Sequence, residues 1–270
     1  MLVSRRDGAL DEARRTTRRV GRTFAIACRM LPRSLRDDVY LLYLVFRTLD
    51  DAVDEGRPDA GERVAAVERW AGGGPAESRE AELLAELATR HPIPRDAVAE
   101  FCVGMRDDLE GRPIVTEEEL DRYCYRVAGT VGVVMSSVLR VRRPEARDQA
   151  AALGMAMQRT NILRDIDEDL AYGRIYLARE TLDRYGSLEP GAREQLVRDQ
   201  IARADALYDQ GVAGIPELRH GRRAIAAAAA MYREILRQIE RDGYGRVAGR
   251  SVVPRRRKVI LAARNVVLPS

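Results

Sequence analysis

QRTNILRDIDED, from Gln158 to Asp169, carries the pattern that decides the fold. On a helix its polar side chains recur at steps of three, four and four positions and share one face, with neighbouring Cβ atoms about 5–6 Å apart. They are Gln158, Asn161, Asp165 and Asp169. Met157 and Ile162 place apolar side chains on other faces. For one isolated stretch of this kind, a solvated polar face is the simpler interpretation, because buried acids and amides need partners.

A second stretch repeats the spacing: LYLVFRTLDDAVDE, from Leu42 to Glu55. Its polar face carries Tyr43, Arg47, Asp50 and Asp54. Apolar residues such as Leu44 and Leu49 cover much of the rest of this predicted helix. Two acidic stripes with the same spacing, far apart in the sequence, predict two carboxylate pairs that face a common cavity.

Carboxylates that face one another across a cavity require cations between them, because they repel and lose solvation on burial. The chain has only two histidines, His91 and His220, and three scattered cysteines, with no CxxC or HExxH motif. Oxygen ligands without soft ligands favour Mg²⁺ or Mn²⁺ over zinc. Because Mg²⁺ is held by a few carboxylates together with phosphate and water, the pattern predicts a site for a diphosphate attached to an apolar body.

The composition bounds the class of protein. With 270 residues, of which 46% are hydrophobic and 33% charged, the chain fits a single domain over residues 1–270 with a sizeable core. No apolar run is long enough to span a membrane, and the first residues do not resemble a signal peptide. Cys28, Cys102 and Cys124 are expected to be reduced thiols, which favours a cytoplasmic location. The net charge of +4 is too small to indicate nucleic acid.

Helical periodicity extends along the chain, and Pro or Gly separates the predicted helices, for example at Pro32 and at residues 111–113. No strand-like alternation persists, and there is no Asn-Gly hairpin. Thr116 and Glu119 form a predicted capping box. Ser34 is a candidate cap for the helix that carries the first acidic stripe. We therefore predict an all-α helical bundle around a central cavity.

These motifs resemble those of the squalene/phytoene synthase family, the head-to-head class I isoprenoid synthases. The similar stretches are DDAVD (residues 50–54), NILRDIDED (161–169), GRIYL (173–177), YCYRVAGTVG (123–132), MYREILRQIERDGYGRVAGRSVV (231–253) and RTFAIACRMLP (22–32). In the last of these, Thr23 stands where a serine is common. The resemblance spans nearly the whole chain in the family's order, and it implies a class I isoprenoid synthase-like bundle.

The stripes and the resemblance together suggest roles for individual residues. The expected ligands of Mg²⁺ and the substrate diphosphates are Asp50, Asp54, Asp165 and Asp169, with Asn161 assisting. Tyr43 and Gln158 are expected to face the cavity, and Arg47 to orient the aspartates or touch phosphate. The resemblance implies phosphate contacts for Arg22, Arg164 and Arg250, and places Thr23 and Phe24 at the substrate. Asp51 and Asp167 fall off the stripes and are expected to support the site or to be exposed.

The helix after Thr116 contains Gly129 and Gly132, each of which costs about 1 kcal/mol relative to alanine inside a helix. Close packing between helices explains such glycines, and so does a local bend that gives a prenyl chain room beside the cavity. The resemblance favours the second interpretation, with Tyr123, Val127 and Gly132 as wall residues. The two interpretations are compatible.

In the family, one allylic diphosphate ionises and its cation is attacked by the double bond of a second, giving a cyclopropylcarbinyl diphosphate. This intermediate ionises and rearranges to a 1,1′-linked product. The resemblance therefore implies a prenyltransferase that forms phytoene from geranylgeranyl diphosphate, or squalene or dehydrosqualene from farnesyl diphosphate. Only squalene requires NADPH, and the tail from Ile239 to Val259 is similar to bacterial phytoene synthases. The proton acceptor is expected to be the released diphosphate or a tyrosine such as Tyr232.

Two alternatives belong to other classes. A terpene cyclase on the same scaffold would act on one diphosphate, but such pockets tend to use aromatic faces, and this chain has three Phe and one Trp, although ten Tyr. A catalytically silent assembly subunit would have eroded motifs, whereas both DxxxD motifs are intact.

Basic residues are concentrated near both ends of the chain. They are Arg14, Arg15, Arg18, Arg19 and Arg22 near the start, and Arg250, Arg255, Arg256, Arg257 and Lys258 near the end. Most are expected to be solvated. The others can contact diphosphate or rest on an anionic membrane surface that receives a lipid product.

Overall fold

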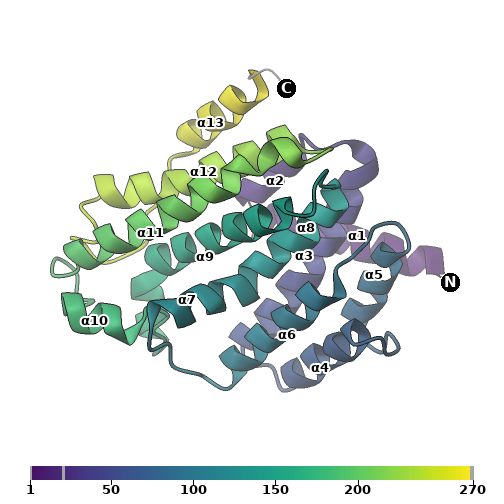
Figure 1. Ribbon diagram of the computed structural model, residues 1–270, viewed down its shortest axis with the longest axis horizontal. Coiled ribbons are helices and arrows are strands. Elements are labelled where there is room, and N and C mark those ends of the chain that lie inside the picture. Colours follow the sequence, from purple (N-terminus) through teal and green to yellow (C-terminus); the bar gives the residue numbers. More distant parts are fainter. Residues whose placement is uncertain (1, 20–21, 268–270) are drawn as a thin grey trace.

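The computed structural model describes residues 2–19 and 22–267, and of these the side chains of residues 2–5, 22, 23, 262 and 264–267 lie outside the description. Within those limits the chain is helical, with one isolated β-bridge between Val141 and Leu218 and no strand, so the all-α prediction is confirmed (Figure 1). The elements are α1 (Leu2–Arg19), α2 (Arg22–Cys28), α3 (Arg33–Asp54), α4 (Ala60–Ala71), α5 (Arg79–Ala88), α6 (Arg95–Leu109), α7 (Glu117–Cys124), a π-helix (Tyr125–Gly129), α8 (Thr130–Leu139), α9 (Ala146–Ala171), α10 (Arg179–Tyr185), α11 (Glu194–Ala213), a 3₁₀ turn (Ile215–Glu217), α12 (Arg222–Arg241) and α13 (Arg255–Val267).

The long helix α9 lies between two groups of helices (Figure 1). It packs against α11 and α12 on one side and against α7, the π-helix and α8 on the other. One apolar core joins α3 to α4, α5, α6 and α8, and a second joins α9 to α7, α11 and α12. The two helices that carry the acidic stripes therefore belong to different cores, and the space between them is where a site can form.

Helix α3 is held in the first core by apolar residues that cover most of its surface. Leu41, Leu42 and Leu49 are completely buried, and each such burial contributes about 1.5–3 kcal/mol. The helix begins at Arg33, directly after Pro32, and no side chain caps it. The prediction that Ser34 caps this helix is therefore wrong. Pro32 is the N-cap instead, so the helix starts two residues earlier than a cap at Ser34 would place it, and Ser34 lies inside the first turn.

The segment from α7 to α8 confirms two predictions. The capping box of Thr116 and Glu119 is present at the start of α7. The helix then widens into the π-helix Tyr125–Gly129 before it continues as α8, and such π segments are frequent at functional sites. Packing also requires the glycines, because a Cβ on Gly132 would lie 2.3 Å from the carbonyl oxygen of Ala150 in α9. Close packing therefore explains Gly132, and the interpretation that the bend gives a prenyl chain room stays a prediction.

Cys28, Cys102 and Cys124 are free and buried, as predicted. Burial raises the pKa of each thiol to about 12, so they are packing residues rather than nucleophiles. Among the helices in the described ranges, none combines the length and the apolar character needed to cross a membrane.

Candidate active site

The first acidic stripe lies along the last turns of α3. Arg47 donates from Nη1 to Oδ2 of Asp50 over 3.1 Å and from Nη2 to Asp51. Asp54 accepts a hydrogen bond over 2.7 Å from Nη1 of Arg174, which follows α9 in the chain. Asp50 keeps 39% of its side-chain surface exposed and lies at the margin of the core, and the region between the acidic ends of α3 and α9 is called the acidic cleft. The loop after α9 is thereby tied to the end of α3.

The second stripe lies along the last turns of α9. Arg164 donates from Nε to Oδ1 of Asp165 over 2.8 Å, and Nε of Arg250 lies 3.0 Å from the same oxygen. Asp169, one turn further, forms no ion pair with any residue that the structure describes. The two carboxylates of this stripe therefore differ, since one is neutralised by arginine and the other is not.

Repulsion between carboxylates marks the place where the stripes meet. Burial and then the charge of the neighbouring Asp54 raise the pKa of Asp50 to about 7. Burial, Asp165 and Asp54 together raise the pKa of Asp169 to about 7. Asp108 of α6 responds in the same way, because burial and then the charges of Asp54 and Asp50 raise its pKa to about 7. Asp54 is the common neighbour of all three, and the cleft has too little positive charge for its acids.

The donor set of this cleft fits Mg²⁺ or Mn²⁺. No three His, Cys, Asp or Glu side chains in the described part of the chain are close enough to form a complete metal centre. The Oδ1 of Asn161 is buried and has no hydrogen-bond partner, while the amide nitrogen of Asn161 donates to Oε1 of Gln158 over 3.3 Å. Mg²⁺ characteristically takes one or two carboxylates from the protein and completes its shell with phosphate and water. Hard oxygen donors in separated pairs match that requirement.

An apolar pocket of about 270 Å³ adjoins the stripes. Its wall includes Phe24, Tyr43, Val127, Gly132, Met157 and Tyr232. Tyr43 precedes Asp50 by seven residues on α3, and Met157 precedes Asp165 by eight on α9, so each helix runs from the pocket to the acids over about 10–12 Å. The same two helices therefore line the apolar pocket at one level and carry the acids further along.

Aromatic side chains lie where the pocket approaches the cleft. The rings of Phe24 and Tyr43 lie 5.1 Å apart with a tilt of 31°. Burial, opposed in part by Arg47, raises the pKa of Tyr43 to about 12, so its hydroxyl stays protonated at neutral pH. Tyr232 of α12 lies near both Tyr43 and Arg164. Three elements distant in sequence thus enclose the junction.

The structure brings most of the predicted residues whose side chains it describes to this region. Tyr123 does not line the apolar pocket. It stacks on Tyr176 at 5.4 Å and donates from its hydroxyl to Oδ2 of Asp108 over 3.2 Å, in a polar pocket beside the acids. Arg22 and Thr23 begin α2, but their side chains lie outside the described residues.

Asp167 lies off the second stripe and holds neighbouring segments of the chain in place. Arg193 donates to both of its carboxylate oxygens, over 2.6 and 2.7 Å, and the backbone N–H of Gly249 donates to it over 2.7 Å. These hydrogen bonds hold the pKa of Asp167 below its usual range. Gly249 precedes Arg250, so this carboxylate fixes the loop that carries an arginine to Asp165.

Three residues of the cleft were not assigned roles from the sequence: Asp108, Arg174 and Tyr176. Asp108 has no acid three or four residues away on either side, so it forms no acidic stripe in the sequence. Arg174 and Tyr176 lie in the GRIYL stretch, which was noted only as a similarity. That stretch was the one signal that could have identified them.

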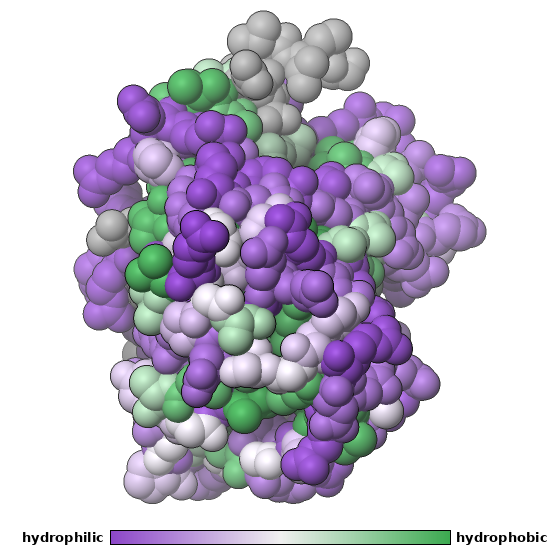
Figure 2. All heavy atoms as spheres, turned by 90° about the vertical axis from the view of Figure 1, so that its left-hand side faces the viewer, coloured by the Kyte–Doolittle hydropathy of each residue, from purple (hydrophilic) through white to green (hydrophobic). Residues whose placement is uncertain are grey.

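One face of the molecule carries apolar side chains between hydrophilic margins. Figure 2 looks at the left-hand side of Figure 1, toward α10 and the adjoining ends of α11 and α12. Apolar and weakly polar residues gather across the lower half of this face.

Comparison with solved structures defines the class of protein. A dehydrosqualene synthase crystallised in complex with a ligand superimposes with a TM-score of 0.87 at 26% identity, covering 97% of this chain and 96% of the other. A squalene synthase from Alicyclobacillus acidocaldarius superimposes with a TM-score of 0.77 at 26% identity, covering 89% and 96%. The fold is that of the helical isoprenoid synthases, as predicted.

Comparison of sequences gives the family. The squalene/phytoene synthase family model matches residues 17–258. A phytoene synthase of Thermus thermophilus is 39% identical over 241 residues, covering 85% of this chain and 82% of the relative. A 15-cis-phytoene synthase of Synechococcus elongatus is 33% identical over 280 residues, covering 93% and 90%. The chain belongs to the squalene/phytoene synthase family, which confirms the resemblance.

Proposed function

We propose that this protein joins two molecules of geranylgeranyl diphosphate head to head to form phytoene. One observation carries the proposal: α3 and α9, the two helices that bear the paired carboxylates, also line one apolar pocket. A diphosphate needs the first feature and a prenyl chain needs the second. The similarity to phytoene synthases over most of the chain favours phytoene over squalene or dehydrosqualene.

We further propose that the cleft holds Mg²⁺ together with the substrate diphosphates. The ligands would be Asp50, Asp54, Asp165 and Asp169, with the unpartnered Oδ1 of Asn161 as an additional donor. Bound Mg²⁺ supplies electrostatic stabilisation of the departing diphosphate. The raised pKa values of Asp50 and Asp169 support the proposal, because they reflect first burial and then neighbouring acids without sufficient counter-charge.

The arginines of the cleft are suited to bind the substrate phosphates. Arg164 and Arg250 surround Asp165 in this structure, and a guanidinium that pairs with a carboxylate can pair with a phosphate in the same bidentate geometry. Arg174 holds Asp54 in place. We assign diphosphate contact to Arg164 and Arg250 and a positioning role to Arg47 and Arg174.

The apolar wall excludes water while a carbocation exists. In the first half-reaction the C1–O bond of one substrate breaks, the C2–C3 double bond of the second forms bonds to C1, and a proton leaves to give the cyclopropylcarbinyl diphosphate and free diphosphate. In the second half-reaction this diphosphate leaves, the ring rearranges, and loss of another proton gives the central double bond of phytoene. Val127 and Met157 line the pocket without a nucleophile. Because Tyr43 stays protonated, we assign proton acceptance to the released diphosphate.

A product assay tests the proposal and its alternatives. Purified protein would be incubated with Mg²⁺ and either geranylgeranyl or farnesyl diphosphate, with and without NADPH, and the hydrocarbons analysed by gas chromatography–mass spectrometry. We expect a C40 hydrocarbon whose yield does not depend on NADPH. A C30 product would identify farnesyl diphosphate as the substrate instead. A cyclic C20 product would indicate a terpene cyclase. If neither substrate were consumed, the result would favour a catalytically silent subunit.

We also propose peripheral contact with an anionic membrane surface, because the product is a lipid. The segment from Val252 through α13 exposes Arg255 and Arg256 together with Val259 and Ile260, a combination that suits a membrane interface. Sedimentation with anionic vesicles tests this contact. The double variant Val259→Ser/Ile260→Ser is expected to remain in the supernatant to a greater extent than the unmodified protein.

A further inference from the structure

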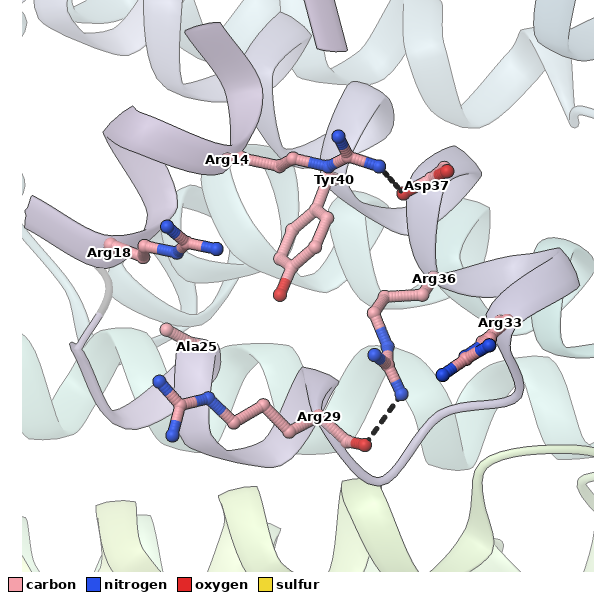
Figure 3. A pocket seen from close by; sticks show the side chains of 8 residues that line it. All are labelled: Arg14, Arg18, Ala25, Arg29, Arg33, Arg36, Asp37 and Tyr40. Atoms are coloured by element: carbon pink, nitrogen blue, oxygen red, sulfur yellow. Dashed lines mark hydrogen bonds and ion pairs between the residues drawn. The ribbon is translucent and has the colours of Figure 1, made fainter. Parts of the chain in front are cut away.

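A second charged pocket lies at the opposite end of α3 from the acids, between α1, α2 and the start of α3. It has a volume of about 540 Å³ and is lined by Arg14, Arg18, Arg29, Arg33, Arg36 and Tyr40. Figure 3 shows their side chains converging from three segments, with the Tyr40 hydroxyl directed between Arg18 and Arg29. Tyr40 and Asp50 are ten residues apart on α3, about 15 Å along the helix, so this arginine pocket is separate from the acidic cleft.

The arginine pocket contains far more positive than negative charge. Asp37 is the one acidic residue among the described residues that line it, and its Oδ1 already accepts a hydrogen bond from Nη2 of Arg14 over 2.9 Å. Arg18, Arg29 and Arg33 form no ion pair with any carboxylate among the described residues. Like charges held this close repel one another, and a bound anion would relieve that repulsion.

Part of the pocket is rigid. Arg36 donates from Nη2 to the carbonyl oxygens of Arg29 and Leu31, over 2.7 and 2.8 Å, and the first of these bonds is drawn in Figure 3. Its Nε is buried and has no partner. The uncapped start of α3 at Arg33 adds the positive end of a helix dipole. Fixed donors of this kind lower the entropic cost of ordering side chains around a ligand.

We propose that the arginine pocket binds a phosphate-bearing anion, either free diphosphate or the head group of an anionic phospholipid. Several guanidinium groups without carboxylate partners match a ligand with more than one charged oxygen, and planar guanidinium groups pair with phosphate oxygens in bidentate fashion. The volume falls in the range of small-molecule sites. The proposed catalysis does not use this pocket.

Occupancy would connect three segments of the chain. Arg14 and Arg18 belong to α1, Arg29 follows α2, and Arg33 begins α3. Helix α2 also carries Phe24, which lines the apolar pocket on a different face from the buried Ala25 at the arginine pocket. An anion held by these arginines would therefore restrain the helix that forms one wall of the apolar pocket.

Isothermal titration with inorganic diphosphate, in EDTA and without divalent cations, tests the proposal with three variants. Arg29→Gln/Arg33→Gln removes two exposed guanidinium groups from the arginine pocket and leaves the Arg29 carbonyl in place for Arg36. Arg15→Gln/Arg147→Gln is the matched control, because both residues are exposed and outside the pocket. Arg164→Gln/Arg250→Gln reports binding in the acidic cleft.

We expect the arginine-pocket variant to bind diphosphate at least about tenfold more weakly, and the matched control to bind as the unmodified protein does. Flotation with phosphatidylcholine vesicles, with or without phosphatidylglycerol, then distinguishes the sources of the anion. Selective loss of phosphatidylglycerol binding in the arginine-pocket variant identifies a lipid head group, and loss of diphosphate binding alone identifies a soluble anion. Either result supports a phosphate site.

The proposal is overturned if only the cleft variant loses diphosphate affinity, or if the arginine-pocket variant matches its control in both assays. Turnover measured on the same proteins distinguishes a failure of the anion-site proposal from a failure of the proposed function. Without added anion, turnover is expected to stay at the unmodified level in the arginine-pocket variant and to fall in the cleft variant.

Discussion

At the scale of single residues, Asp50 and Asp165 allow a direct test of the metal-binding assignment. Asn keeps the shape of either side chain but removes the charge that attracts a cation. We expect Asp50→Asn and Asp165→Asn each to lower turnover by about 10²–10³-fold, with an unchanged far-ultraviolet circular dichroism spectrum. Asp183→Asn, at an exposed position of α10, is the matched control. A folded pair of variants with near-normal turnover would remove both residues from the site.

Asp108 allows a second prediction at this scale, because the sequence did not identify it. Burial and the charges of Asp54 and Asp50 raise its pKa to about 7, and a protonated carboxyl does not attract Mg²⁺. We expect Asp108→Asn to raise the half-saturating Mg²⁺ concentration for turnover several-fold above about pH 7, and less below it. Asp107→Asn is the control, because Asp107 pairs with Arg126 and Arg112. Equal responses in the two variants would show that the charge of Asp108 has no specific effect on Mg²⁺ binding.

At the scale of helices, Gly132 lies where α8 packs closely on α9. The Cβ of Gly132→Ala would lie 2.3 Å from the Ala150 carbonyl oxygen, which forces the helices apart and costs about 1–3 kcal/mol of unfolding free energy. Gly61→Ala in α4 meets only Leu109, at 4.0 Å, and is expected to stabilise by up to about 1 kcal/mol. Urea denaturation measures both. Equal urea midpoints for Gly132→Ala and the unmodified protein would show that the two helices move apart without loss of stability.

The contact of α7 with α9 and α11 predicts a dependence on pH. Glu117 accepts hydrogen bonds from Arg159 over 2.9 Å, from Gln200 over 2.7 Å and from Thr181. Burial alone raises the pKa of Glu117, but the hydrogen bonds from Thr181 and Arg159 outweigh it and hold the pKa below its usual value. A lowered pKa in the folded state gives stability that is present above the unfolded-state pKa and lost as pH falls through the folded-state pKa.

Glu117→Gln is therefore expected to destabilise the protein by about 3 kcal/mol at neutral pH and by less in acid, where the unmodified protein loses the same contribution. Thermal melts across pH check this. Glu118→Gln is the control, because Glu118 is exposed and pairs only with Arg122 on the same helix. A destabilisation of Glu117→Gln that does not change with pH would assign the effect to packing instead of charge.

At the scale of the whole molecule, the sequence predicted what depends on periodicity and missed what depends on tertiary approach. The stripes at Asp50 and Asp165 follow from helical spacing, and Pro and Gly mark the helix ends. Asp108 and Arg174 reach the cleft only because α6 and the loop after α9 approach the end of α3, which no local pattern encodes. Tyr123 lines the polar pocket beside Asp108 instead of the apolar pocket, and the sequence pattern does not distinguish these two pockets.

The arrangement of charge in the whole molecule predicts that metal and substrate bind together. The described acids do not form a complete metal centre by themselves, and their mutual repulsion opposes a diphosphate that arrives without a cation. The diphosphate therefore supplies oxygen ligands that the metal needs, and the metal supplies the positive charge that the diphosphate needs. We expect Mg²⁺ with geranylgeranyl thiodiphosphate, whose C–S bond resists ionisation, to raise the melting temperature by about 5–10 °C at saturation, and either ligand alone to raise it by much less. Asp54→Asn is expected to abolish the joint effect. Equal shifts with the analogue in EDTA would mean that the apolar pocket and the arginines bind the substrate without a metal.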